Sequence, residues 1–159
     1  MDEIKELLIA KFNEILRRTL SVIDQLGDEE LNWRPNESSN SIANLIVHVQ
    51  GNVKERILNG ILHRGLTRNR DAEFEELYKS KDELIEITKE TYQTIVDTIG
   101  NMPEETWKKT QLVRNKERTN LDMIIQCATH FSEHLGQMMY IGKLIKDKDY
   151  VVTSIPKKK

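Results

Sequence analysis

The sequence predicts an all-α fold, and more specifically a four-helix bundle. Apolar residues recur at spacings of three and four through most of the chain, which is the period of an amphipathic helix. Only 7 Gly and 3 Pro interrupt the 159 residues. Polar connections separate four long periodic segments, so the helices have to bury their apolar faces against one another.

Each helix is placed by its apolar face and by its start and stop residues. We expect them at about Asp2 to Leu26, Ser41 to Gly65, Ser80 to Ile99 and Asn120 to Ile145. Gly27 is a plausible stop for the first helix, and Ser41 is a favourable N-cap for the second. Because the connections are long, neighbours in sequence need not be antiparallel neighbours in space.

Composition excludes several classes of protein. The chain has 24 Lys and Arg against 26 Asp and Glu, a net charge of -2, which argues against a nucleic-acid binder. Its apolar runs are too short for a membrane span, and the start Met1-Asp2-Glu3 lacks the apolar segment of a signal peptide, so we expect a cytoplasmic protein. We expect one domain over residues 1–159, with a short tail from about residue 146 that pairs as a strand or docks on a helix.

Three of the four histidines point to a metal site. His130 and His134 are four residues apart, so their side chains stack on one helix face within reach of a common ion. The two histidines belong to a row of residues spaced three and four apart, which favours a position facing the bundle interior. The other members of this row are Met123, Cys127, Gln137 and Ile141.

His48 is the third candidate ligand. It lies beside the apolar face of the second expected helix, in a polar ribbon that continues through Asn52, Arg56 and Asn59. If that helix packs beside the fourth, His48 reaches the other two. Three histidines with an open position are typical of catalytic zinc, whereas ordinary hydrogen-bonded histidines are the alternative.

The motifs around these histidines resemble the DinB/YfiT-like superfamily of metal-binding four-helix bundles. Residues 130–137, HFSEHLGQ, match its H-x-x-x-H-x-G-Q signature, and residues 40–48, NSIANLIVH, resemble its second-helix segment. The resemblance implies an up-down-down-up bundle, frequent homodimers, and nickel or zinc held by His48, His130 and His134.

Relatives in that superfamily include S-transferases that use bacillithiol and isomerases that use mycothiol. The resemblance therefore implies a metal-dependent enzyme that transfers a low-molecular-weight thiol to an electrophilic small molecule. A metal-dependent hydrolase and a non-catalytic metal-binding or stress-response bundle are the alternatives. The sequence alone names neither the thiol nor the substrate, and the catalytic residues stay unassigned.

Several neighbouring residues have more than one interpretation. His130, Glu133 and His134 spell the H-x-x-E-H of inverted zincins, although the chain is short for such a peptidase. Cys127 is expected to be packing, with a ligand or redox role as the alternative. The hydrogen-bond partners of the ligand rings also stay open, with Asn44, Asn52 and Gln137 as candidates. The arginines after the second helix either form a solvated loop or attract an anionic thiol or substrate; they are Arg64, Arg68 and Arg70.

Overall fold

A computed structural model describes residues 1–158 and confirms the all-α bundle. The long helices and their turns are α1 (Asp2–Asp24), α3 (Ile42–Val53) with the π-helical turn η1 (Lys54–Asn59), α4 (Lys81–Asn101) and α6 (Asn120–Lys146). Short elements fill the connections: α2 (Asp28–Asn32), η2 (Asp71–Phe74), α5 (Glu104–Lys108), β1 (Thr110–Val113), β2 (Lys116–Thr119) and η3 (Asp147–Asp149).

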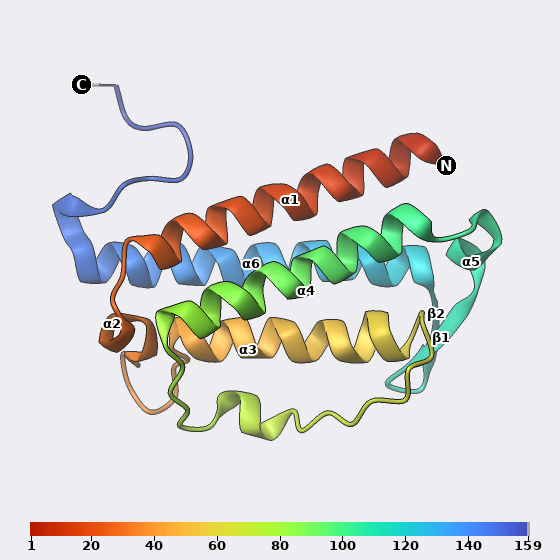
Figure 1. Ribbon diagram of the computed structural model, residues 1–159, viewed down its shortest axis with the longest axis horizontal. Coiled ribbons are helices and arrows are strands. Elements are labelled where there is room, and N and C mark those ends of the chain that lie inside the picture. The colour runs from red at the N-terminus through yellow and green to blue at the C-terminus, as the bar shows by residue number, and fades with distance from the viewer. Residues whose placement is uncertain (159) are drawn as a thin grey trace.

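The helices run up-down-down-up, as the family resemblance implies. In Figure 1, α1 and α6 run in one direction, and α3 and α4 run in the other. Both α1 and α3 pack against α4 and α6. Because α3 and α4 are parallel, the segment between them, residues 60–80, travels back along the whole bundle (Figure 1). This crossover covers one side of α3 and brings η2 against it.

Local capping explains where three of the long helices begin. Ser41 accepts a hydrogen bond from the backbone N–H of Asn44, and Ser80 accepts one from that of Glu83. In both cases the side chain of the third helical residue, N3, accepts a hydrogen bond from the backbone N–H of the cap residue, which completes a capping box. Thr119 caps α6 through the N–H of Asp122.

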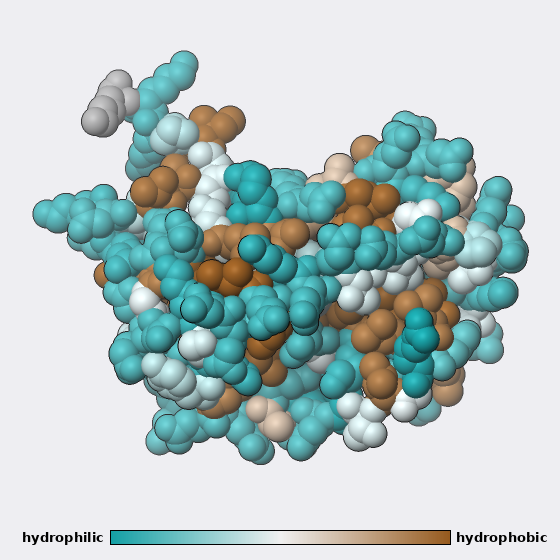
Figure 2. Space-filling view, in the orientation of Figure 1, coloured by the Kyte–Doolittle hydropathy of each residue, from teal (hydrophilic) through white to brown (hydrophobic). Residues whose placement is uncertain are grey.

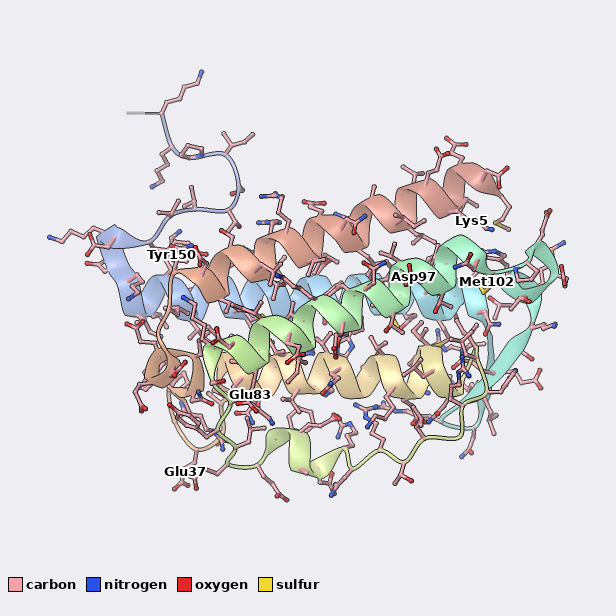
Figure 3. The ribbon with its side chains drawn as sticks, in the orientation of Figure 1. Lys5, Glu37, Glu83, Asp97, Met102 and Tyr150 are labelled. Carbon is pink, nitrogen blue, oxygen red and sulfur yellow. The ribbon has the colours of Figure 1, made fainter. Side chains whose placement is uncertain are left out.

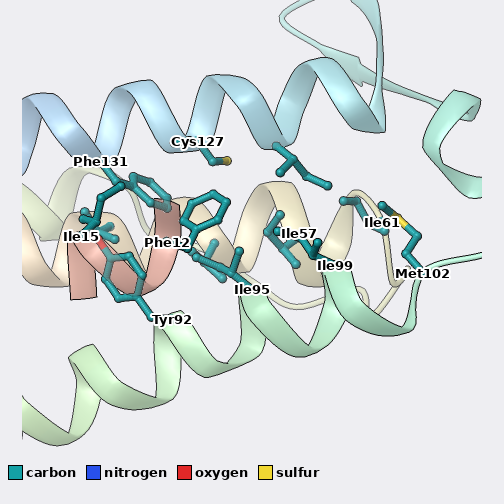
Figure 4. Close-up of a cluster of buried hydrophobic side chains, with 14 of the residues drawn as sticks. Phe12, Ile15, Ile57, Ile61, Tyr92, Ile95, Ile99, Met102, Cys127 and Phe131 are labelled. Carbon is teal, nitrogen blue, oxygen red and sulfur yellow. The ribbon is translucent and has the colours of Figure 1, made fainter. Parts of the chain in front are cut away.

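Apolar residues of all four long helices form the core. Phe12 of α1, Tyr92 of α4 and Phe131 of α6 meet with ring centroids 6.2–6.5 Å apart, a spacing typical of favourable aromatic pairs (Figure 4). A second cluster, around Val22, Leu45 and Leu84, continues the core toward the other end of the bundle. On the face in Figure 2, hydrophilic residues cover most of the surface and apolar residues emerge between them.

The second helix is shorter than expected. It ends as an α-helix at Val53, passes through η1, and does not reach Gly65. The side chain of Asn59 binds both the N–H and the carbonyl of Leu66, which turns the chain back into the crossover. His63 adopts a positive φ of 53°, so the helix cannot continue through it.

The sequence analysis did not predict the short elements in the connections, and the β1–β2 hairpin is the one among them that adds strands. Thr110 pairs with Thr119 and Val113 with Lys116 in an antiparallel ladder. Arg114 and Asn115 form its two-residue turn with positive φ values of 47° and 64°. Both strands are short and mostly polar, so neither shows the alternation that identifies a strand in sequence.

The chain after α6 docks on a helix, the second of the two expected outcomes. The side chain of Gln25 exchanges two hydrogen bonds with the backbone of Val151, and Arg18 of α1 donates to the Thr153 hydroxyl. Tyr150 lies at this end of the bundle in Figure 3, whereas Lys5 binds the Met102 carbonyl at the other end.

Candidate metal centre

Three imidazoles from two helices converge on one point. His48 comes from α3, and His130 and His134 come from successive turns of α6. Nε2 of His130 lies 2.8 Å from Nε2 of His134 and 3.4 Å from Nε2 of His48. All three residues offer a ligand atom within 4.8 Å of the others. The structure thus brings together the histidines that the sequence singled out.

The hydrogen bonds on the opposite ring nitrogens fix which atoms face inward. Nδ1 of His48 lies 3.0 Å from Oε1 of Glu73, and a carboxylate only accepts, so this nitrogen carries the proton. Nδ1 of His134 lies 2.7 Å from the amide oxygen of Gln137, which also accepts. Both Nε2 atoms therefore present lone pairs to the same small volume.

These lone pairs fit a divalent cation. An ion about 2.0–2.1 Å from each nitrogen places tetrahedral or octahedral neighbours roughly 2.9–3.4 Å apart. The two measured Nε2 separations, 2.8 and 3.4 Å, fall close to that range. Lone pairs this close repel one another unless a proton or a cation lies between them, so the donor set suits nickel or zinc.

Burial favours the neutral, metal-binding form of two of the three rings, His48 and His130. Burial first, and then the neighbouring His134 and His48, together lower the pKa of His130 from 6.5 to about 4. Burial also lowers the pKa of His48, although the bond to Glu73 acts in the opposite direction. At neutral pH both rings are uncharged, which is the form that binds a metal.

Glu73 of η2 orients His48 and is itself held firmly. The Arg68 guanidinium forms two hydrogen bonds with its carboxylate, of 2.7 and 2.9 Å. Asn44 donates to the backbone carbonyls of Glu73 and Glu75, which fixes the loop on α3. The Arg68–Glu73–His48 chain is therefore a rigid bracket for one ring of the cluster.

Gly51 makes room for this bracket. It lies on α3, one turn after His48, and a Cβ at this position would fall 1.9 Å from Oε2 of Glu73 and 3.0 Å from Nε of Arg68. Any larger residue would push the carboxylate off its place beside the imidazole. The glycine is thus a packing requirement of the site, since its helical backbone needs no special φ.

Sequence reasoning missed Glu73, and it left Asn44 and Asn52 open as possible partners of a ligand ring. Asn44 completes the capping box of its own helix and holds the η2 loop, and Asn52 accepts from the Cys127 thiol at 3.6 Å, so neither binds His48. Glu73 lies in the crossover, where no periodicity marks it. Its position five residues after Arg68 is a weak signal, because Asp71, Glu75 and Glu76 are also nearby in the sequence.

Other candidates take different places. Gln137 binds His134, although it is exposed and not interior as its position in the row of spaced residues predicted. Glu133 is also exposed and has no hydrogen bond among the residues described. Cys127 is buried, and burial raises the pKa of its thiol to about 12, so it behaves as packing. Trp107 is buried in the core, whereas Trp33 is 42% exposed.

The cluster is open on one side. A cavity of about 350 Å³ reaches His48 and His130 and is walled by Asn52, Arg56 and Arg114 among others. Phe74 packs against His48 with ring centroids 4.7 Å apart and shields the imidazole from the crossover side. A small molecule in this cavity would lie directly beside the histidines.

The bundle has the fold of DinB-like proteins. The chain belongs to the family described as "Protein of unknown function (DUF1572)", whose model matches residues 3–159. No curated protein matches the sequence.

Solved structures share the fold. A conserved protein from Enterococcus faecalis is 14% identical with a TM-score of 0.74, over 88% of this chain and 95% of that one. A DinB-like protein from Bacillus cereus is 13% identical with a TM-score of 0.70, over 88% and 91%. The DinB-like protein YjoA of Bacillus subtilis is 15% identical with a TM-score of 0.64, over 92% and 96%.

Proposed function

We propose that this protein binds a divalent metal ion, nickel or zinc, through His48, His130 and His134, and uses it in catalysis on a small molecule. The observation that carries this proposal is the convergence of three Nε2 atoms beside an open cavity. When bound, the ion supplies positive charge that stabilises a thiolate at neutral pH. The favoured reaction is therefore transfer of a low-molecular-weight thiol to an electrophilic substrate.

The surrounding residues support a catalytic rather than a purely structural site. A structural zinc site is closed by four protein ligands, and among residues 1–158 only these three histidines form such a group. Cys127 is the nearest candidate for a fourth ligand, but its thiol donates to Asn52 and is kept protonated by burial. The bracket of Glu73 and Arg68 keeps His48 oriented while the cavity stays accessible.

The setting of the protein is part of the same proposal. Within residues 1–158, no helix is both long enough and apolar enough to cross a membrane. We propose that the protein works in the cytoplasm as a homodimer, without nucleic acid as a partner. A metal-dependent hydrolase and a non-catalytic bundle are the competing functions. Glu133, the general base in an inverted zincin, is exposed, which gives the peptidase interpretation no support.

Metal titration is the first test. Metal-free protein is titrated with Ni²⁺ and Zn²⁺, and the bound ion is quantified by mass spectrometry. We expect one ion per chain in the wild type and a large loss in His134→Ala. His63→Ala is the matched control, because His63 is exposed and is not a member of the cluster. Equal metal content in the two variants would refute the ligand assignment.

A thiol screen is the second test. Metal-loaded protein is supplied with bacillithiol, glutathione or cysteine and an electrophilic reporter, and consumption of the thiol is followed. We expect turnover that disappears in His134→Ala and persists in His63→Ala. Absence of turnover with every thiol, in protein that does hold metal, would reject the transferase and leave the metal site standing.

A further inference from the structure

The entrance to the histidine cluster is strongly basic in a protein whose net charge is -2. Two cavities of about 360 and 350 Å³ share Asn52, Arg56, Arg114 and His130, so they adjoin and make up one hollowed region of the surface. Six cationic side chains line it: Arg56, Arg68, Arg70, Arg114, Lys116 and Arg118. Among the described residues, Glu55 is the one acidic residue in either lining.

Several of these cations have no carboxylate partner. Two of the six do have one: Arg68 forms an ion pair with Glu73, and Arg118 forms one with Asp122 at 2.9 Å. Within residues 1–158, Arg56, Arg114 and Lys116 form no ion pair with an acidic side chain. Arg70 lies over the Phe74 ring instead, 4.9 Å from its centroid. Uncompensated positive charge at the mouth of a concave site attracts and concentrates anions.

The fold holds these cations in place. η1 puts Arg56 half-buried on the wall of the hollow. Nε2 of Gln111 in β1 donates to the Arg56 carbonyl, and its amide lies where a Cβ on Gly60 would clash. This contact docks the hairpin on η1 and sets its turn, with Arg114 and Lys116, over the hollow. Burial lowers the pKa of the Arg56 guanidinium, a cost that a bound anion would offset.

We infer that this hollow binds a small molecule with at least two anionic groups, carboxylates or phosphates, and holds its other end beside His130. The inference rests on the proposed function, because it specifies the chemical class of the substrate or thiol used at the histidine cluster. Arg56 and Arg114 are the residues that recognise the anionic groups. Guanidinium forks suit both carboxylate and phosphate oxygens.

Binding to metal-free protein tests the inference without any need for turnover. Protein stripped of metal by a chelating resin is titrated calorimetrically at low ionic strength with succinate and with inorganic pyrophosphate. Acetate and the neutral succinamide are the matched small-molecule controls. We expect one or both dianions to bind at least about tenfold more tightly than acetate, and a rise in salt to weaken the binding. The two dianions distinguish a carboxylate ligand from a phosphate ligand.

Variants locate the binding. Arg56→Gln and Arg114→Gln should each weaken the binding of the tighter-binding dianion about tenfold, as expected for loss of one charge-assisted contact. Arg64→Gln removes the same charge from an exposed position outside the hollow and should leave binding unchanged. Arg114 lies on an exposed turn, so its variant keeps the test valid even if Arg56→Gln does not fold.

Two results would overturn the inference. In the first, acetate and succinamide bind as tightly as the dianions. In the second, Arg64→Gln weakens dianion binding as much as Arg114→Gln does, which would mean that the anions are attracted to the protein surface in general. Failure here leaves the metal and thiol experiments unaffected. Dianion binding without thiol turnover would instead reject the transferase and retain the anion site.

Discussion

The Glu73 carboxylate and the His48 imidazole form a buried pair, with Oε1 and Nδ1 3.0 Å apart and both side chains only 6% exposed. The pair joins a crossover residue to a helix residue 25 positions earlier. Because Arg68 neutralises the carboxylate, Glu73 orients the ring without forcing it to be charged.

Glu73→Gln should weaken the metal site. The amide loses the charge that Arg68 pairs with, and it no longer fixes the tautomer of His48. We expect metal affinity to fall about 10- to 100-fold, as for other residues that orient ligands. Loss of a buried charge partner should also cost about 1–3 kcal/mol of unfolding free energy. Competition with a chromogenic chelator measures the affinity, and Glu75→Gln, in the same loop but exposed, is the control. Unchanged affinity in Glu73→Gln would contradict the positioning role.

Gly51→Ala should disturb the same bracket from the helix side. The new methyl group overlaps the Glu73 carboxylate, which His48 and Arg68 prevent from moving freely. We expect a loss of about 1–3 kcal/mol in denaturant unfolding, the usual effect of overpacking. Gly100→Ala is the control, because nothing lies within 4 Å of the added methyl, and the change should be neutral or stabilising by up to about 1 kcal/mol. Equal effects at both glycines would argue against a tight fit at Gly51.

The metal-free protein should lose stability as the pH falls below about 6.5. The folded pKa of His130 is about 4, below its ordinary value of 6.5, so the unfolded chain takes up the proton first. The neutral ring therefore stabilises the fold fully above pH 6.5, and this contribution is lost between 6.5 and 4. Thermal unfolding of wild type and His130→Gln across this range measures it. The variant should show a shallower fall in melting temperature, and parallel curves would contradict the shift at His130.

Cys127 should resist modification while the protein is folded. Its thiol is buried, is bonded to Asn52, and has a pKa raised to about 12, so the reactive thiolate is scarce. In Figure 4 it lies with the apolar cluster around Phe12 and Phe131. We expect iodoacetamide to label it only in denaturant, as measured by intact mass. Rapid labelling of native protein would restore the redox interpretation of this residue.

The sequence was informative wherever a local rule applied. The helical period placed all four long helices, and the i, i+4 spacing placed His130 and His134 on one face of α6. The sequence predicted Ser41 as an N-cap and Ser80 as the start of the next long helix, and both are N-caps in the structure. Such starts can be predicted because a cap depends on residues within one turn. The H-x-x-x-H-x-G-Q motif also indicated Gln137, whose bond to His134 depends on a spacing of three along the same helix.

Tertiary structure alone decided what residues distant in sequence do together. Glu73 meets His48 because the crossover folds back along α3, and Arg114 and Arg56 line the same hollow because a polar hairpin docks on a π-helical turn. Neither the crossover nor the hairpin has a periodic apolar pattern, since their positions depend on hydrogen bonds and charge pairs with distant parts of the chain. The sequence by itself therefore determined the helices and the three candidate ligands. The bracket that orients His48 and the basic entrance to the cluster emerged only from the folded chain, because contacts between distant segments have no local signature.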